Sequence, residues 1–357
     1  MTSDDDNTIF SNCLVTVVPV YSTHYYENES TSGTAPIDSN VYFEGDVFYI
    51  KSCNDLLKSN FTFSHWNTQT DGTGTTYLTE SLFTQGTKNL DLYAQWIECT
   101  DGLSFSYFNG YNLSGYSGSE INIIIPEKYK GKPVRSIDSN AFKDNSSITS
   151  VFLPNTLNSL GYGAFHNCES LITANIPTSI TQIESFTFSH CSNLASITIP
   201  NSITKIDSFA FEYCSKLTTI TIPASVTILD NYALANCTEL TSVTLPNSLI
   251  KINEGVFAYC TKLTSIIIPE NVTIIGHGAF QNSGLTSLII PSNVTYISDG
   301  AFFDSALTLL RVENTTPPLL GDNAIPSNTN IKVPSDSVSL YKTATGWSNY
   351  ADNISGY

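Results

Sequence analysis

The stretch CSKLTTITIPASVTILDNYALANC, residues 214–237, decides the fold, because a near copy stands directly before it and another directly after it. Proline marks the copies and recurs at positions 126, 154, 177, 200, 223, 246, 269 and 291. The first of these intervals is 28 residues, the next five are 23 residues and the last is 22 residues. A period of about 20–29 residues predicts a solenoid, in which each repeat forms one coil and buries its apolar edge against its neighbours.

Two further residue types keep the same period, each at its own position within the repeat. One position holds Phe142, Phe165, Phe188, Phe211, Leu234, Phe257, Phe280 and Phe302. The other position lies three residues later and holds Cys168, Cys191, Cys214, Cys237 and Cys260. We expect both sets to form buried columns. The cysteines are predicted to be free thiols, because the Cβ vectors of stacked equivalents run parallel and five members cannot all pair.

Within the repeat, apolar residues alternate with hydroxyl residues before each proline. Ile220 and Ile222 are predicted to point inward, together with Leu217. Thr219 and Thr221 then point outward, as the two-residue period of a strand requires. Proline ends the strand, because it has no N–H to donate. The sequence therefore predicts a mainly β fold of about eight 23-residue coils, which share one parallel sheet.

The whole repeat has the form L-x-x-I-x-I-P-x-x-V-x-x-I-x-x-x-A-F-x-x-C, and the stretch IIIPENVTIIGHGAFQNS, residues 266–283, matches it nearly throughout. Over residues 121–312 the chain resembles the BspA-like type of leucine-rich repeat. This resemblance implies a curved solenoid whose parallel sheet is concave. It also implies display at the surface of microbes or protozoa, adhesion to other proteins or cells, and no enzymatic activity.

Residues 1–97 lack this period and predict a small β-rich domain of the β-grasp-like kind. Residues 90–96 alternate strictly between the two faces of a strand, and Asp71–Gly72 marks a hairpin turn. Trp66 and Trp96 are the expected core anchors. Through W-N-T-x-x-D-G-x-G-x-x-Y and L-Y-A-x-W, this part resembles the Listeria–Bacteroides repeat, the internalin-type B-repeat module. That module is a stalk or spacer in its relatives, which again implies surface display.

The chain is thus divided into four predicted segments. In IKVPSDSVSLYKTATGWSNYADNI, residues 331–354, Ser335 is the expected N-cap of a helix, and the segment is expected to cover the last open coil. We expect the two main parts to fold independently, with a boundary near residues 97–102. The segments are the β domain at 1–97, a linker and start of a cap at 98–120, the solenoid at 121–312 and a C-terminal cap at 313–357.

Charge excludes several classes of partner. The formal net charge is −17, with 15 Lys and Arg residues against 32 Asp and Glu residues, so neither nucleic acid nor an anionic membrane surface is expected to bind. No run of about 18 apolar residues is present, so no membrane insertion is expected. The start MTSDDDNTIF lacks the basic and apolar regions of a secretory signal, so no signal peptide is expected within this chain. A cell-surface or secreted location is implied by the two resemblances.

The five His and eight Cys residues form no catalytic or metal-binding pattern. The sequence has no H-E-x-x-H, C-x-x-C, G-x-S-x-G or phosphate-binding loop. His190 precedes Cys191, but Cys191 occupies a repeated core position, so a structural role is expected. Asp71 supplies one carboxylate, which is too few for a calcium site. We therefore expect no enzyme, no cofactor and no metal.

The outward positions of the predicted strands form the candidate binding surface. Small hydroxyl residues dominate the middle of the stack, and aliphatic residues with one arginine dominate its C-terminal third. One interpretation is that Ser, Thr and Ile are simply good strand formers. The other is that an exposed apolar strip marks a partner site. The predicted binding residues are Thr219, Thr221, Ser242, Thr244, Ser265, Ile267, Ser287, Ile289, Leu309 and Arg311.

These observations predict a non-catalytic cell-surface binding or adhesion protein that presents a curved repeat surface to a protein or host-cell ligand. Self-association through the C-terminal half of the solenoid is a second kind of partnership open to that surface. The alternative function is a structural spacer or array protein with no specific ligand. Binding energy is expected to concentrate in Ile267, Ile289, Leu309 and Arg311, because apolar and arginine anchors contribute more than small hydroxyls.

Overall fold

The computed structural model describes residues 19–357, except residues 54, 55, 57, 59, 60, 80, 109 and 131. The predicted first domain therefore includes eighteen residues, 1–18, that lie outside the described part of the chain. Two compact units are present, and the division between them falls at Ile97 and Glu98, apart from residues 60–62, which group with the second unit. The fold is almost entirely β.

The first unit contains a mixed four-stranded sheet and a separate antiparallel strand pair. β1 runs parallel to β6, whereas β3 and β4 are antiparallel. The second pair, β2 and β5, is also antiparallel. The sheet has the order β1 (Thr23–Tyr26), β6 (Leu90–Glu98), β3 (Phe61–Asn67), β4 (Thr76–Tyr77), and the pair is β2 (Val47–Tyr49) and β5 (Leu82–Thr84).

The core of the first unit is built around Trp66, which is fully buried as predicted. Its ring lies 4.9 Å from that of Tyr25 in an edge-to-face arrangement. Trp96 is only partly buried, and its indole N–H donates to the carbonyl of Asn28 at 2.7 Å. Asp71 lies in the turn between β3 and β4, as predicted, and its carboxylate accepts the N–H of Thr73 at 3.0 Å.

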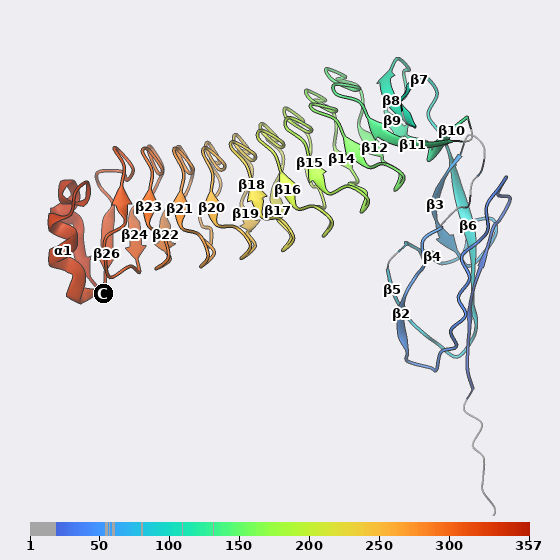
Figure 1. Ribbon diagram of the computed structural model, residues 1–357, viewed down its shortest axis with the longest axis horizontal. Helices are drawn as coiled ribbons and strands as arrows, with labels where there is room; N and C mark the ends of the chain where they lie inside the picture. Colours follow the sequence, from blue (N-terminus) through green and yellow to red (C-terminus); the bar gives the residue numbers. More distant parts are fainter. Residues whose placement is uncertain are drawn as a thin grey trace, which may run out of the picture. The chain divides into compact units, whose positions relative to one another are not determined.

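The second unit is a solenoid whose coils are stacked in a row between the green and red parts of the chain (Figure 1). Strands of successive coils pair in parallel and in register, so that Thr219 lies beside Ser242 and Ile289 beside Arg311. The strands on this side of the stack form three separate parallel sheets rather than the single predicted sheet, and we call them together the first ladder. The first sheet comprises β9 (Asn122–Ile124), β12 (Ser150–Phe152) and β14 (Thr173–Ala174), and the second comprises β17 (Thr219–Thr221) and β19 (Ser242–Thr244). The third comprises β22 (Ser287–Ile290), β24 (Leu309–Val312), β26 (Asn330–Val333) and β27 (Ile354–Gly356).

The structure adds a second parallel ladder, which the sequence analysis did not predict. Most of its strands are only two residues long, and all but the first follow the proline of their coil. Its members are β8 (Tyr111–Tyr116), β11 (Lys132–Ile137), β13 (Ser159–Leu160), β15 (Gln182–Ile183), β16 (Lys205–Ile206), β18 (Ile228–Leu229), β20 (Lys251–Ile252), β21 (Ile274–Ile275), β23 (Tyr296–Ile297) and β25 (Leu319–Leu320). Two strands at the N-terminal end, β7 (Leu103–Tyr107) and β10 (Lys128–Tyr129), pair antiparallel with β8 and β11 respectively.

Both predicted columns are buried between the coils. The phenylalanine rings stack nearly face to face, with centroid separations between 5.1 and 5.6 Å, except where Leu234 interrupts the column. The five cysteines are free thiols that are fully shielded from solvent. Each thiol donates to a main-chain carbonyl of the preceding coil; Cys214, for example, bonds to the oxygen of Phe188 at 3.3 Å. Cysteine thus fills space and also satisfies a buried acceptor.

The C-terminal cap extends the first ladder by two strands, β26 and β27, and closes it with short helices. Tyr341 and Trp347 are fully buried, and their rings meet edge to face at 4.9 Å. The prediction that Ser335 caps a helix is wrong, because this residue begins a 3₁₀ turn and its hydroxyl donates instead to the carbonyl of Tyr357. The helical elements are η1 (Ser335–Ser337), α1 (Val338–Thr343) and η2 (Trp347–Asn353).

We expect the solenoid to fold without the first unit. A chain that begins at Glu98 should keep a cooperative melting transition within about 4 °C of that of the full chain, because the two units have separate hydrophobic cores. Circular dichroism melts of the two proteins measure this. A loss of cooperative melting on removal of residues 1–97 would show that the first unit is an integral cap of the solenoid.

Candidate binding surface

The ten predicted binding residues lie on the outward side of the first ladder, and all ten are exposed. We refer to them together as the strand face. They come from five successive coils, so the structure brings every one of them onto a single continuous surface. The coil that carries Ser265 and Ile267 keeps the same alternation of exposed and buried residues, although it has no assigned strand there.

Most threonine hydroxyls at the edges of the coils are used to hold the stack together. Thr204 and Thr227 each donate to the carbonyl of the equivalent threonine one coil earlier. Thr241 and Thr308, which directly precede β19 and β24, do the same. These bonds explain why a low-charge repeat is rich in threonine: the side chain completes the hydrogen bonding of the neighbouring coil.

The hydroxyls of the strand face differ, because none of them has an intramolecular hydrogen-bond partner among the residues that the structure describes. The six residues are therefore free to bond to water or to a partner. Their conformation is fixed by the ladder beneath them, so little entropy would be lost when a partner binds. The residues are Thr219, Thr221, Ser242, Thr244, Ser265 and Ser287.

The C-terminal part of the strand face is an exposed apolar strip. Ile267 is 86% exposed, Ile289 is 51% exposed and Leu309 is 41% exposed. Isolated exposed aliphatic residues are common on proteins, but three in neighbouring coils at equivalent or adjoining positions form a contiguous patch. Covering this strip would therefore remove more apolar surface from water than covering any other part of the strand face.

Arg311, the charged residue of the strand face, is held by intramolecular contacts that the sequence analysis did not anticipate. Its guanidinium lies 3.3 Å from the carboxylate of Glu313 and 4.1 Å from the centre of the Tyr357 ring. Lys332 lies beside it on β26 and continues the column. Arg311 is thus oriented by Glu313 and Tyr357, and the basic end of the strip extends into the cap.

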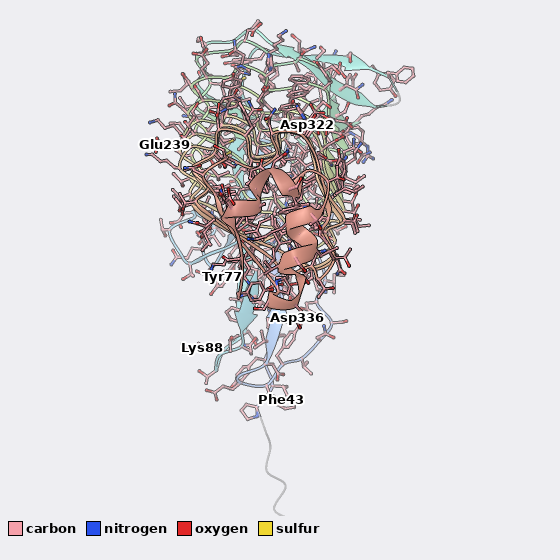
Figure 2. All side chains as sticks on the ribbon, turned by 90° about the vertical axis from the view of Figure 1, so that its left-hand side faces the viewer. Phe43, Tyr77, Lys88, Glu239, Asp322 and Asp336 are labelled. Atoms are coloured by element: carbon pink, nitrogen blue, oxygen red, sulfur yellow. The ribbon has the colours of Figure 1, made fainter. Side chains whose placement is uncertain are left out.

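A shallow hollow of ≈ 660 Å³ lies on the strand face N-terminal to the apolar strip. Thr198, Thr219, Thr221 and Thr244 line it together with buried isoleucines of the same strands. Charged side chains are absent from the lining, although the chain as a whole carries −17. Charged residues such as Glu239 (Figure 2) lie outside this lining. The hollow is therefore a neutral part of the surface of an acidic protein.

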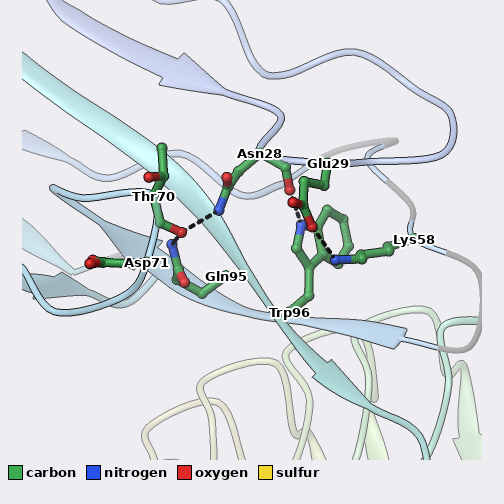
Figure 3. A pocket seen from close by; sticks show the side chains of 7 residues that line it. All are labelled: Asn28, Glu29, Lys58, Thr70, Asp71, Gln95 and Trp96. Carbon is green, nitrogen blue, oxygen red and sulfur yellow. Dashed lines mark hydrogen bonds and ion pairs between the residues drawn. The ribbon is translucent and has the colours of Figure 1, made fainter.

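The first unit has its own small pocket, of ≈ 340 Å³, but its polar groups satisfy one another (Figure 3). Lys58 lies 2.8 Å from the carboxylate of Glu29, and the side-chain amide of Asn28 donates to the carbonyl of Thr70 at 2.9 Å. Asp71 is engaged in its own turn. The arrangement is that of a structural cluster.

No catalytic or metal-binding arrangement emerges from the described residues. His190 contacts the hydroxyl of Ser189 at 2.9 Å, whereas the thiol of Cys191 donates to the carbonyl of Phe165, so the adjacent pair does not form a dyad. Burial raises the pKa of the Cys191 thiol well above its ordinary value, which makes it a poor nucleophile. No group of three or more His, Cys, Asp or Glu residues suited to a metal ion is found in that part of the chain.

Comparison with known proteins identifies the repeat. The pattern described as the BspA type leucine rich repeat region matches residues 116–241 and 181–308, in six copies. Together these matches cover more than half of the chain. They do not extend into residues 1–97, so the resemblance of the first unit to the internalin-type module stays a prediction.

Similar proteins agree with the fold. A solved leucine-rich repeat protein from Bacteroides ovatus is 24% identical, with a TM-score of 0.55, over 72% of this chain and 76% of that one. A protein named as a Gly-rich membrane protein, from Evansella cellulosilytica, is 32% identical over 114 residues. That match covers 31% of this chain and 13% of the relative, so this chain spans a small part of the relative's length. No helix within the described residues is long and apolar enough to cross a membrane.

Proposed function

The chain belongs to the family of BspA-type leucine-rich repeat proteins, and we propose that it is a non-catalytic adhesion protein that binds a protein or host-cell ligand at the cell surface. The contact surface in this proposal is the strand face. Its C-terminal apolar strip supplies most of the binding energy, and its hydroxyl rows supply hydrogen bonds.

The observation that carries the proposal is the contrast between two sets of hydroxyls on one repeat. The hydroxyls of edge threonines such as Thr204 donate to carbonyls of the neighbouring coil. The hydroxyls of Thr219 and Thr221 are exposed and have no hydrogen-bond partner among the described residues. Residues present only because they form strands well would not need to place hydroxyls without partners beside an aliphatic side chain such as Ile267, which is 86% exposed. A rigid surface of this kind supports binding, because its residues are ordered before the partner arrives.

Surface location is supported by the Evansella cellulosilytica relative, which is named as a membrane protein. A second relative from the same organism, 33% identical over 76 residues, is also named as a membrane protein. That match covers 21% of this chain and 11% of the relative. The repeat of this chain would then be the exposed binding part of a longer surface assembly.

A charge-introducing double substitution tests the strand face. In Ile267→Asp with Ile289→Asp, we expect binding to weaken by at least about 30-fold, since covering an unpaired carboxylate costs about 2 kcal/mol or more. The readout is attachment of beads coated with the full chain to a cultured epithelial cell layer, together with sedimentation of the free protein to detect self-association.

Ser196→Asp with Thr198→Asp is the matched control, because it adds the same charge to the same face at the far side of the hollow. This control should weaken attachment by less than about threefold. Both variants should melt as the unmodified chain does, because the replaced side chains point into solvent. Normal attachment of the Ile267→Asp, Ile289→Asp protein would place the ligand on another surface and refute the proposal.

A further inference from the structure

Eight coils of the solenoid have two left-handed turn positions four residues apart, and His190 and Tyr213 occupy the second of them. The first of these positions is left-handed in nine successive coils. Its φ value is close to 60° in all nine coils, from 62° at Asn140 to 52° at Asn323. Glycine and asparagine adopt this conformation readily, and they occupy six of the nine positions. Three successive coils in the middle of the stack instead hold Phe186, Phe209 and Tyr232.

These three aromatic residues are in a conformation that bulky side chains rarely adopt. Their φ values are 61°, 62° and 56°. The fold does not require aromatic residues at this position, because Gly163 and Gly255 serve in the coils on either side with the same φ of 59°. Backbone strain of this sort persists where a side chain serves a purpose beyond the local fold.

The three rings form a stacked row. The centroids of Phe186 and Phe209 are 4.7 Å apart, and those of Phe209 and Tyr232 are 5.2 Å apart with parallel planes. Stacking offsets part of the strain, but it leaves the ring edges in contact with water, since all three residues are half-buried. A second pair, His190 and Tyr213, stacks beside this row at 4.4 Å. We call these five residues the aromatic ridge.

A residue next to the ridge carries a carboxylate without a counter-ion. Glu212 directly precedes Tyr213, its N–H donates to the carbonyl of Phe209, and its own carbonyl accepts the N–H of His190. Its side chain is half-buried, and among the described residues it has no ion pair or hydrogen bond. Burial raises the pKa of this carboxyl group. Nearby, the hydroxyl of Tyr232 donates to the carboxylate of Glu254 at 2.8 Å.

From this geometry we propose that the aromatic ridge is a second interaction surface, which binds a Lys- or Arg-rich segment of a partner protein. The aliphatic stem of a lysine or arginine would lie along the ring edges, and its charged head would pair with Glu212. The net charge of −17 favours the approach of a basic segment. The ridge lies on the turn segments rather than on the strand face, so this inference does not depend on the proposed adhesion surface.

The test uses the full chain and a fluorescein-labelled hexa-arginine peptide, with binding followed by fluorescence anisotropy. Glu212→Gln should weaken binding by about tenfold, since it removes the unpaired carboxylate. The matched control is Glu270→Gln, which changes the net charge equally at an exposed position in a different coil. The control should weaken binding by less than about twofold. Equal effects of the two substitutions would show that the peptide responds only to overall charge, and would overturn the proposal.

Phe209→Asn tests the rings separately, because asparagine tolerates the left-handed backbone and occupies the same position at Asn140 and Asn323. We expect weaker binding of hexa-arginine by about fivefold, with a melting temperature within about 4 °C of that of the unmodified chain. A variant that melts much lower yet binds hexa-arginine normally would assign the ring a purely structural role and refute the ridge. If Phe209→Asn does not fold, the comparison of Glu212→Gln with Glu270→Gln decides the question alone.

Discussion

The solenoid is expected to unfold as the pH rises from about 8.5 to about 10. The cause is the column of five buried thiols. Burial raises the pKa of Cys168 to about 12, and it raises the pKa of Cys214 well above the ordinary value. In the unfolded chain these thiols would titrate near pH 8.5.

The sign follows from proton binding. Above about pH 8.5 the unfolded chain releases thiol protons while the folded chain keeps them, so the unfolded state binds fewer protons and stability falls as pH rises. The contribution of each thiol is fully present below about pH 8.5 and is lost toward its raised folded pKa. At pH 10 the loss is about 2 kcal/mol per thiol, or on the order of 10 kcal/mol for the column, which rivals the whole stability of a typical domain.

Urea unfolding at a series of pH values measures this loss, and Cys214→Val supplies the matched control. The valine is apolar and only slightly larger than cysteine, and it removes one titrating group, so the slope of unfolding free energy against pH should decrease by about 1.4 kcal/mol per pH unit above pH 9. A thiol reagent at pH 8 should leave the column unlabelled in the folded protein and label it after unfolding. Rapid labelling of Cys191, Cys214 or Cys237 in the folded state would contradict the burial on which this prediction depends.

Features that repeat once per coil could be predicted from sequence, because residues one period apart in the sequence lie above one another when the coils stack. Phe211 and Cys214 recur at fixed positions, and equivalent positions must meet in the core when coils pile up in register. The alternation of Thr219, Ile220 and Thr221 likewise fixed which side chains face solvent. The exposure of all ten residues of the strand face, Ile267 included, followed from the same alternation.

Features outside the period escaped prediction for identifiable reasons. The second ladder consists mainly of two-residue strands such as Ile228–Leu229, which are too short for an alternation pattern to show. The contacts of Arg311 come from Glu313 and from Tyr357, the latter 46 positions later in the sequence. Nothing in the sequence of the cap signals that contact.

The strained aromatic residues were missed because phenylalanine and tyrosine carry no sequence signal for a left-handed backbone. Their alignment with Gly255 and Asn140 in the same repeat position was the clue available. In a repeat protein, a position that alternates between glycine, asparagine and bulky residues identifies a left-handed turn. Comparing equivalent repeat positions for the backbone conformation that they require, as well as for their polarity, would therefore have located the aromatic ridge.

Removal of the C-terminal cap is expected to open the solenoid from its C-terminal end. A chain that stops at Pro334 lacks Tyr341 and Trp347, which are fully buried against the last coils. It also lacks two hydrogen bonds that close the stack, from the hydroxyl of Tyr341 to the carbonyl of Asn314 and from the indole of Trp347 to the carbonyl of Pro318. Deleting one buried aromatic side chain alone costs about 3–5 kcal/mol.

Because coils are stabilised mainly by their immediate neighbours, the loss of stability should be largest next to the removed cap and should decrease with distance along the stack. Hydrogen exchange should show lost protection in β24 and β26, a smaller loss near β19 and no loss near β12. The exposed strand edge should also promote association of the shortened chain. Trp347→Ala should reproduce much of this effect. Leu340→Ala is its matched control, since this residue lies on the solvent side of α1 at 48% exposure and should leave protection unchanged. If the chain ending at Pro334 keeps full protection in β24 and β26, the last coils are stable by themselves and the segment does not act as a cap.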